Sequence, residues 1–168
     1  SECIYREKDI ALLAVGSMIP TAIEVRNRLK AQGISCTLVN ARFVKPIDTE
    51  LIDLLLPDHS LLVTLEENVA SGGYGEKVRA YTDTLQTKTK VINICIPDCY
   101  VEHGSVDILR KELKIDAESV VQRILENWKL ILLNQFHDIL PGSSIREVYE
   151  DSKEQYESVL ADGTEMTA

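Results

Sequence analysis

Strand-forming and helix-forming segments alternate along the first 125 residues, and this alternation constrains the fold more than any other feature of the sequence. Residues 10–15 form a continuous apolar run, as expected for a strand that helices cover on both faces. Further strands are predicted over residues 34–39, 60–65 and 90–96, and the mixed polarity of 34–39 places that strand nearer an edge. The alternation predicts an α/β fold whose sheet is parallel or mostly parallel, with helices on both faces.

Capping residues mark where the intervening helices begin and end. Ser17, Asp48, Ser105 and Asp116 each precede a helical pattern and are predicted N-caps. Gly33 follows the first helix at the position where a glycine terminates it. The α/β unit is therefore expected to be complete near residue 125.

Composition and charge narrow the functional classes. Apolar residues make up 45% and charged residues 27% of the 168 residues, as in ordinary globular domains. The net charge of −9 argues against a nucleic-acid partner. No apolar run approaches the ~20 residues of a membrane span and no signal peptide opens the chain, so we expect a cytoplasmic protein without membrane contact. The first residue is not methionine, which suggests a fragment. The cysteines are expected to be reduced thiols; they are Cys3, Cys36, Cys95 and Cys99.

The last quarter of the chain differs from the rest. From residue 126 onward nine acidic residues stand against three basic ones, a net of −6, whereas the first 125 residues carry 18 acidic and 15 basic. Residues 128–136 are largely apolar and are not needed by the α/β unit, so they must pack on it or in a dimer. A break is expected at 141–144, a polar helix at 145–160 and a frayed end. We therefore predict two parts, 1–125 and a helical appendage at 126–168.

A glycine-rich turn in the segment 61–78 is the first candidate site. Gly72, Gly73 and Gly75 follow a predicted strand and precede a helix, a junction where open α/β sheets bind ligands. An anion could bind at the helix N-terminus. However, the spacing is neither that of a dinucleotide fingerprint nor that of a P-loop, so a tight turn with close packing is the favoured interpretation.

Carboxylates precede this turn. Glu66 and Glu67 would repel a phosphate, and as neighbours on a strand they point to opposite faces, which does not suit an acid–base pair. Together with Asn68 they are predicted to cap the turn or to contact a partner.

Two histidine regions have residues with metal-binding chemistry. The chain has three possible zinc ligands at loose spacing in Cys95, Cys99 and His103, and no fourth ligand is obvious. The favoured interpretation is therefore two free thiols and a histidine in a loop. His103 could donate a proton, pack on a tyrosine or bond a carboxylate. His137, beside Asp138, is the better metal candidate by chemistry, although a histidine at a helix C-terminus explains it equally.

Several motifs appear in a familiar order. The segments 9–22, 39–48 and 65–75, followed by Ile-Pro-Asp at 96–98 and Glu-His-Gly-Ser at 102–105, resemble the C-terminal domain of the 1-deoxy-D-xylulose-5-phosphate synthase family, transketolase-like thiamine-diphosphate enzymes. The resemblance covers about residues 1–125. It implies a three-layer α/β/α domain with a five-stranded, mostly parallel mixed sheet in which one strand is antiparallel.

The resemblance also carries functional expectations. Enzymes of this family are homodimers that condense pyruvate with glyceraldehyde 3-phosphate, and thiamine diphosphate and magnesium bind between their first two domains. Neither the metal–diphosphate motif nor the domain with the catalytic glutamate is present here, so no catalytic or cofactor-binding residue is assigned. The expected role is structural, docking to other domains and supporting a dimer, with the turn residues above and the loop residues Pro97, Asp98, His103 and Gly104 contributing.

Residues 128–151 resemble a segment of the zinc-dependent family 38 α-mannosidases, in which the histidine matching His137 is a zinc ligand. The other ligands are missing, and one ligand does not hold catalytic zinc. The chain is therefore interpreted as a fusion near residue 126 or 127. The alternatives are a fragment of such a mannosidase, or a flavodoxin-like module that binds a small ligand in the loop after Asn68.

Overall fold

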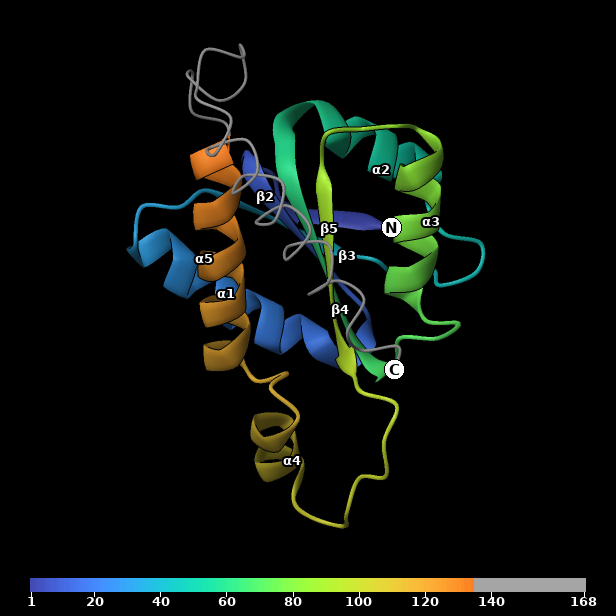
Figure 1. Cartoon of the computed structure of the whole chain (residues 1–168), viewed down its shortest axis with the longest axis vertical. Coiled ribbons are helices and arrows are strands. Elements are labelled where there is room, and N and C mark those ends of the chain that lie inside the picture. Colours follow the sequence, from blue (N-terminus) through green and yellow to red (C-terminus); the bar gives the residue numbers. More distant parts are fainter. Residues whose placement is uncertain (135–168) are drawn as a thin grey trace, which may run out of the picture.

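The computed structural model describes residues 1–134 and shows a five-stranded sheet between two layers of helices (Figure 1). The strand order is β1-β3-β2-β4-β5, in which β2 to β5 run parallel and β1 pairs antiparallel with β3. The α/β class and the mixed five-stranded sheet are therefore confirmed. The strands are β1 (Glu2–Tyr5), β2 (Asp9–Ala14), β3 (Cys36–Asn40), β4 (His59–Val69) and β5 (Lys90–Ile96).

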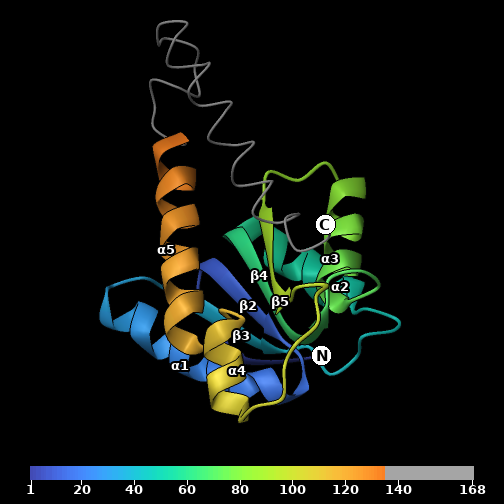
Figure 2. The same cartoon turned by 60° about the horizontal axis from the view of Figure 1, so that its bottom comes forward.

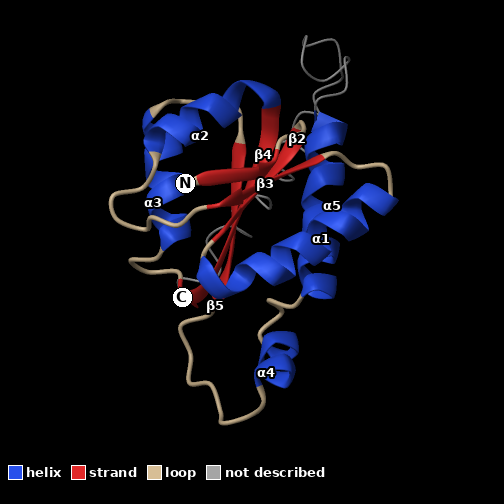
Figure 3. Ribbon diagram, turned by 180° about the vertical axis from the view of Figure 1, so that it is seen from behind, coloured by secondary structure: helices blue, strands red, loops and turns tan. Residues whose placement is uncertain are grey.

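Helices α1 and α5 cover one face of the sheet, and α2 and α3 cover the other (Figures 1 and 3). Helix α4 projects beyond the ends of β4 and β5 (Figure 1), and in the turned view of Figure 2 it lies in front of α1 and the start of α5. The helices are α1 (Ile19–Ala31), α2 (Thr49–Leu55), α3 (Tyr74–Thr84), α4 (Val106–Glu112) and α5 (Ala117–Asn134), with 3-10 turns η1 (Gly16–Met18) and η2 (Leu56–Asp58).

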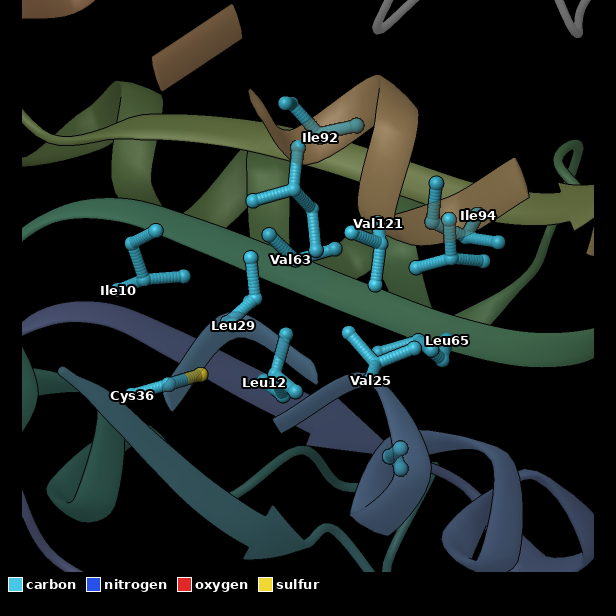
Figure 4. Packing of buried hydrophobic residues seen from close by; sticks show 14 of the residues in the cluster. Ile10, Leu12, Val25, Leu29, Cys36, Val63, Leu65, Ile92, Ile94 and Val121 are labelled. Atoms are coloured by element: carbon cyan, nitrogen blue, oxygen red, sulfur yellow. The ribbon is translucent and has the colours of Figure 1, made fainter. Parts of the chain in front are cut away.

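The central strand β2 supplies side chains to both layers, which explains its unbroken apolar sequence. Leu12 lies in the cluster beneath α1 and α5, whereas its neighbour Leu13 lies in the cluster beneath α2 and α3. Figure 4 shows the first cluster, in which Leu12 and Val63 from the sheet lie among Leu29 of α1 and Val121 of α5. Because successive strand residues point to opposite faces, a strand covered on both sides must be apolar throughout.

Most of the predicted helix ends are observed, and their hydrogen bonds explain them. Asp48 accepts the backbone N–H of Leu51 at 3.0 Å, and Asp116 caps α5 through the backbone and hydroxyl groups of Ser119. Gly33 has φ +79° and, with Ile34, forms the paired bonds of a Schellman motif at the end of α1.

Two of the predicted N-cap serines do not form a capping hydrogen bond. Ser17 lies in η1 and its hydroxyl donates to Glu67 instead of capping α1, which begins at Ile19 without a side-chain cap. Ser105 is at the N-cap position of α4, but its side chain makes no capping bond. Both helices therefore begin without a capping hydrogen bond from the predicted serine hydroxyl.

The largest difference from the predicted strand bounds is at the end of β4, and one further strand was not predicted from the sequence pattern. Strand β4 continues from the predicted end at residue 65 through Val69, with an irregular register against β5 over that extension. The edge strand β1, whose four residues are exposed, was not predicted from the sequence pattern. It pairs antiparallel with β3, which is therefore the second strand from that edge, in agreement with the expectation that it lies nearer an edge.

Helix α5 runs without interruption through residues 125 and 126 and carries the start of the apolar 128–136 run. Trp128 packs against the core cluster and Ile131 is 2% exposed, whereas Leu132 and Leu133 on the same helix are about half exposed. The α/β unit thus covers one side of this run over the described residues 128–133. The expected break at 141–144 and the helix at 145–160 lie outside the described residues. Within residues 1–134, no helix meets the length and apolarity that crossing a bilayer requires.

Candidate functional site

The candidate site is the junction where β4 ends, the glycine turn follows and α3 begins. It lies at the carboxyl ends of the parallel strands, in the lower half of the view in Figure 1. Glu66 and Glu67 stand next to each other here, but their surroundings differ. Glu66 is 3% exposed, whereas the side chain of Glu67 keeps 27% of its surface open to solvent.

Glu66 binds the N-terminus of α3. Its two carboxylate oxygens accept the backbone N–H groups of Tyr74 at 2.7 Å and Gly75 at 2.9 Å. These are donors that a helix leaves without intrahelical partners, and they are the groups that would bind a phosphate. The protein's own carboxylate therefore takes the place of an anionic ligand at this turn.

The glycines of the turn are required by backbone conformation and by close packing. Gly72 has φ +75°, which favours glycine. A Cβ on Gly73 would lie 2.7 Å from Glu66 Oε1 and from the carbonyl oxygen of Val69. A Cβ on Gly75 would lie within 2.5 Å of Thr64 Oγ1. The turn is thus packed against the end of β4 and leaves no room for a ligand between them.

Glu67 joins three segments on the other side of the strand. It accepts a hydrogen bond from the hydroxyl of Ser17, and Arg110 of α4 donates its Nε–H to Glu67 Oε1 at 2.7 Å. The Arg110 hydrogen bond is the main reason that the pKa of Glu67 lies below its ordinary value. Asn68 beside it is exposed. Glu67 is thus the ionic contact that holds α4 to the sheet.

The remaining candidate residues lie in the connection between β5 and α4. Asp98, His103 and Gly104 are exposed, and Pro97 is half-buried. Tyr100 exposes 90% of its surface and so offers His103 little packing. The loop is therefore an open surface rather than a pocket.

The proposed zinc ligands are not brought together in the described part of the chain. Cys95 is buried, and burial raises the pKa of its thiol to about 11, whereas Cys99 is exposed. Residues 1–134 contain no group of three histidine, cysteine or acidic side chains with metal-binding geometry. His137 and Asp138 lie outside the described residues.

Sequence reasoning missed three residues of this junction. Arg110 and Ser17 lie 43 and 50 residues from Glu67, and nothing in the sequence indicates that they meet it. Asn93 hydrogen-bonds Thr64 at 2.9 Å beneath Gly75, and its only signal is a polar residue inside an apolar strand. Together these contacts define a tightly bonded strand–turn–helix junction and an exposed face carried by α4.

A sheet of order 1-3-2-4-5 with one antiparallel edge strand and helices on both faces defines a class of α/β domain found in transketolase-type enzymes. The family model described as "Transketolase, C-terminal domain" matches residues 2–120. The chain belongs to the transketolase C-terminal domain family.

The curated relatives name one enzyme. The chain is 46% identical over 124 residues to 1-deoxy-D-xylulose-5-phosphate synthase of Lachnoclostridium phytofermentans, covering 73% of this chain and 20% of the relative. It is 40% identical to the synthase of Chlorobaculum tepidum and 34% identical to that of Chlamydia pneumoniae. The chain thus spans about a fifth of the length of these relatives.

Solved structures agree with this assignment of fold. A split-gene transketolase, described as an inactive beta4 tetramer, superposes with a TM-score of 0.67 at 28% identity, over 72% of this chain and 39% of that one. A transketolase of Pichia stipitis superposes with a TM-score of 0.58 at 16% identity, which shows the fold alone; it covers 76% of this chain and 18% of that one.

A second family model, "Alpha mannosidase middle domain", matches residues 77–168 and so also places the chain's C-terminal half in that family. Its match overlaps the first over residues 77–120. In that overlap β5 is hydrogen-bonded to β4 as part of the sheet, so these residues take the transketolase-type fold. The match agrees with the resemblance noted at residues 128–151.

Proposed function

We propose that residues 1–125 are the non-catalytic C-terminal domain of a 1-deoxy-D-xylulose-5-phosphate synthase, which docks onto the other domains of that enzyme and supports its homodimer. The full enzyme would condense pyruvate with glyceraldehyde 3-phosphate, using thiamine diphosphate and magnesium held by domains that precede this one. The observation that carries the proposal is the junction at Glu66. A site that binds its own carboxylate at the helix N-terminus supports a structural role better than a ligand-binding one.

The surface that we assign to docking is the α4 face, defined here as Tyr100, Val106 and Ile108. Val106 and Ile108 are 59% and 56% exposed, and α4 has no buried residue. Apolar side chains exposed on a projecting helix and on the loop before it favour a protein partner, because their exposure to water is unfavourable. Arg110 on the same helix anchors this face to the sheet through Glu67.

Complementation tests the docking role. The full chain is mixed with the Lachnoclostridium synthase from which the corresponding C-terminal region has been removed, and synthase activity is measured. We expect activity to return, and Val106→Asp with Ile108→Asp to weaken it at least tenfold. Leu54→Asp is the matched control, because Leu54 is equally exposed, at 57%, on α2 at the opposite edge. If Leu54→Asp weakens the restored synthase activity as much as Val106→Asp with Ile108→Asp does, the assignment of the α4 face is contradicted.

Calorimetry tests the absence of cofactor binding. The full chain is titrated with thiamine diphosphate in the presence of magnesium, and we expect no saturable heat. Clear saturable binding would overturn the non-catalytic part of the proposal and leave the docking experiment unaffected.

We further propose that residues 126–168 have a different origin from residues 1–125. The charge change near residue 126 supports this boundary, and the α-mannosidase match, which spans residues 77–168, includes these residues. The competing function is a zinc site at His137. Metal analysis after dialysis distinguishes the two. Stoichiometric zinc that is lost on His137→Ala would favour the zinc site, and its absence from the dialysed protein would favour a tail without that function.

A further inference from the structure

The connection between β3 and α2 presents an aromatic side chain to solvent. We call residues 41–47 the Phe43 loop. Phe43 exposes 58% of its surface. Its neighbours in the loop differ, because Ala41 is fully buried and Val44 and Ile47 pack against the cluster beneath α2 and α3. The loop therefore turns its smaller apolar side chains toward the core and leaves the largest one in water.

The backbone of the loop fixes where Phe43 projects. The backbone N–H of Phe43 donates to the carbonyl oxygen of Ala41 at 2.5 Å, which closes a three-residue turn around Arg42. Arg42 has φ +53°, a conformation that residues other than glycine rarely adopt. An ion pair between Arg42 and Glu2 of β1, at 3.3 Å, ties the turn to the edge strand. A backbone held in this way at a surface turn is typical of functional sites.

The first residue of the chain is bound to the same loop. The Ser1 hydroxyl donates to the carbonyl oxygen of Ala41 at 2.7 Å, and the Ser1 nitrogen donates to Asp48 Oδ2 at 2.8 Å. The side chain of Ser1 is only 2% exposed. Figures 1 and 3 show the N-terminus beside the loop that follows β3. Any chain that precedes residue 1 therefore starts next to Phe43.

The proposed function supplies the partner for this surface. In a synthase whose C-terminal domain is this chain, the other domains come before residue 1, and the chain spans about a fifth of such relatives. The domain that precedes residue 1 is then tethered beside the Phe43 loop, which gives it a high effective concentration there. An aromatic side chain that enters an apolar pocket is a common anchor of such contacts, because it buries a large apolar area.

We infer that the Phe43 loop is a second docking surface, at which Phe43 inserts into an apolar pocket of the domain that immediately precedes residue 1 in the parent synthase. The inference rests on the proposed function and adds to it a contact separate from the α4 face. The Phe43 loop follows β3, the second strand from one edge of the sheet, whereas α4 follows β5 at the other edge. Each surface can therefore be altered without changing the other.

Isothermal titration calorimetry tests this contact. The full chain is titrated into the Lachnoclostridium synthase from which the corresponding C-terminal region has been removed, and the dissociation constant is measured for the parent chain and for each variant. We expect Phe43→Asp to weaken binding about tenfold or more, because a charge replaces the anchoring aromatic side chain. Phe43→Leu keeps an apolar side chain and should bind within about fivefold of the parent chain.

Leu54→Asp is the matched control. Leu54 is as exposed as Phe43, at 57%, and lies just beyond the other end of β1, where Arg6 donates to its carbonyl oxygen. This variant should bind within about twofold of the parent chain. Because both side chains lie in solvent, the variants should unfold in urea at the same concentration as the parent chain, which separates lost binding from lost folding.

The outcomes distinguish this inference from the proposed function. If Phe43→Asp binds as tightly as the parent chain, the inference is overturned while the docking role stands. An equal loss in Leu54→Asp would also overturn it, because the effect would not be specific to the Phe43 loop. If the parent chain does not bind the truncated synthase, the proposed docking function itself fails, and the inference fails with it.

Discussion

Gly75 shows how closely the start of α3 approaches the sheet. A Cβ at this position would meet Thr64 Oγ1 at 2.5 Å and the side chain of Asn93 closer still, and both of these are buried and hydrogen-bonded to each other. The constraint is steric, because Gly75 is not among the residues with positive φ. The sequence showed that glycines cluster here, but not which of them a methyl group would exclude.

We therefore expect Gly75→Ala to destabilise the protein by about 1–3 kcal/mol, the usual cost of overpacking a closely packed site. Urea denaturation measures this. Gly104→Ala is the control, because its Cβ would meet only the end of the Leu109 side chain at 3.2 Å, and it should cost less than about 0.5 kcal/mol. Equal stability of the Gly75→Ala and parent proteins would contradict the packing described at this junction.

The cysteines divide into two pairs by exposure. Burial raises the pKa of Cys36 to about 12 and that of Cys95 to about 11, whereas Cys3 and Cys99 are exposed. Because the thiolate is the reactive form, iodoacetamide at pH 8 should modify Cys3 and Cys99 in the native protein, and the other two only after unfolding. Mass spectrometry of the alkylated peptides checks this. Early modification of Cys36 would contradict its burial.

At the scale of elements, an ion pair joins α4 to the sheet. Arg110 binds Glu67, and the pKa of Glu67 is lowered mainly for that reason. A carboxylate whose folded pKa lies below its unfolded value of about 4.3 stabilises the fold above that value. The contribution is lost as the pH falls through the folded pKa. The attachment of α4 should therefore weaken in acid.

Glu67→Gln should accelerate amide hydrogen exchange in α4 roughly fivefold at neutral pH, equivalent to about 1 kcal/mol for a partly exposed ion pair. The difference between variant and parent should disappear at a pH well below 4, where both side chains are uncharged. Glu102→Gln serves as a control, because Glu102 is exposed in the loop before α4. A difference that persists unchanged in acid would show that the ion pair does not hold the helix.

At the scale of the whole molecule, α5 connects the α/β unit with the apolar run that follows residue 125. Ile131 is 2% exposed and belongs to the same cluster as the central strands, whereas Leu133 is 51% exposed. Ile131→Ala should therefore destabilise the entire domain by about 2–5 kcal/mol. Leu133→Ala, a control on the same helix, should cost less than about 0.5 kcal/mol.

Thermal or urea unfolding of the full chain measures both variants. If Ile131→Ala and Leu133→Ala behave alike, α5 does not pack on the sheet beyond residue 125 as described. The result also bears on the proposed junction near residue 126, because it shows how far the stability of the α/β unit extends into the segment that resembles a mannosidase.

Much of the fold could be predicted because the evidence for it is local. Segments rich in apolar residues marked β2, β4 and β5, and the caps at Asp48 and Asp116 act within three residues of themselves. Strand β1 could not be predicted from its pattern, since Glu2–Tyr5 are all exposed and their strand conformation depends on pairing with β3. The sequence predicted the end of β4 too early, because most of the last residues of this strand are polar.

The site was harder to predict because its decisive contacts join distant segments. The sequence by itself determined an α/β domain, its family and the absence of a phosphate fingerprint at the glycine turn, since these depend on periodicity, spacing and order. Only the tertiary structure decided that Glu66 binds the N-terminus of α3 while Glu67 binds Arg110. The two carboxylates are identical in chemistry and adjacent in the chain, and their roles differ because the strand directs one into the fold and the other toward α4.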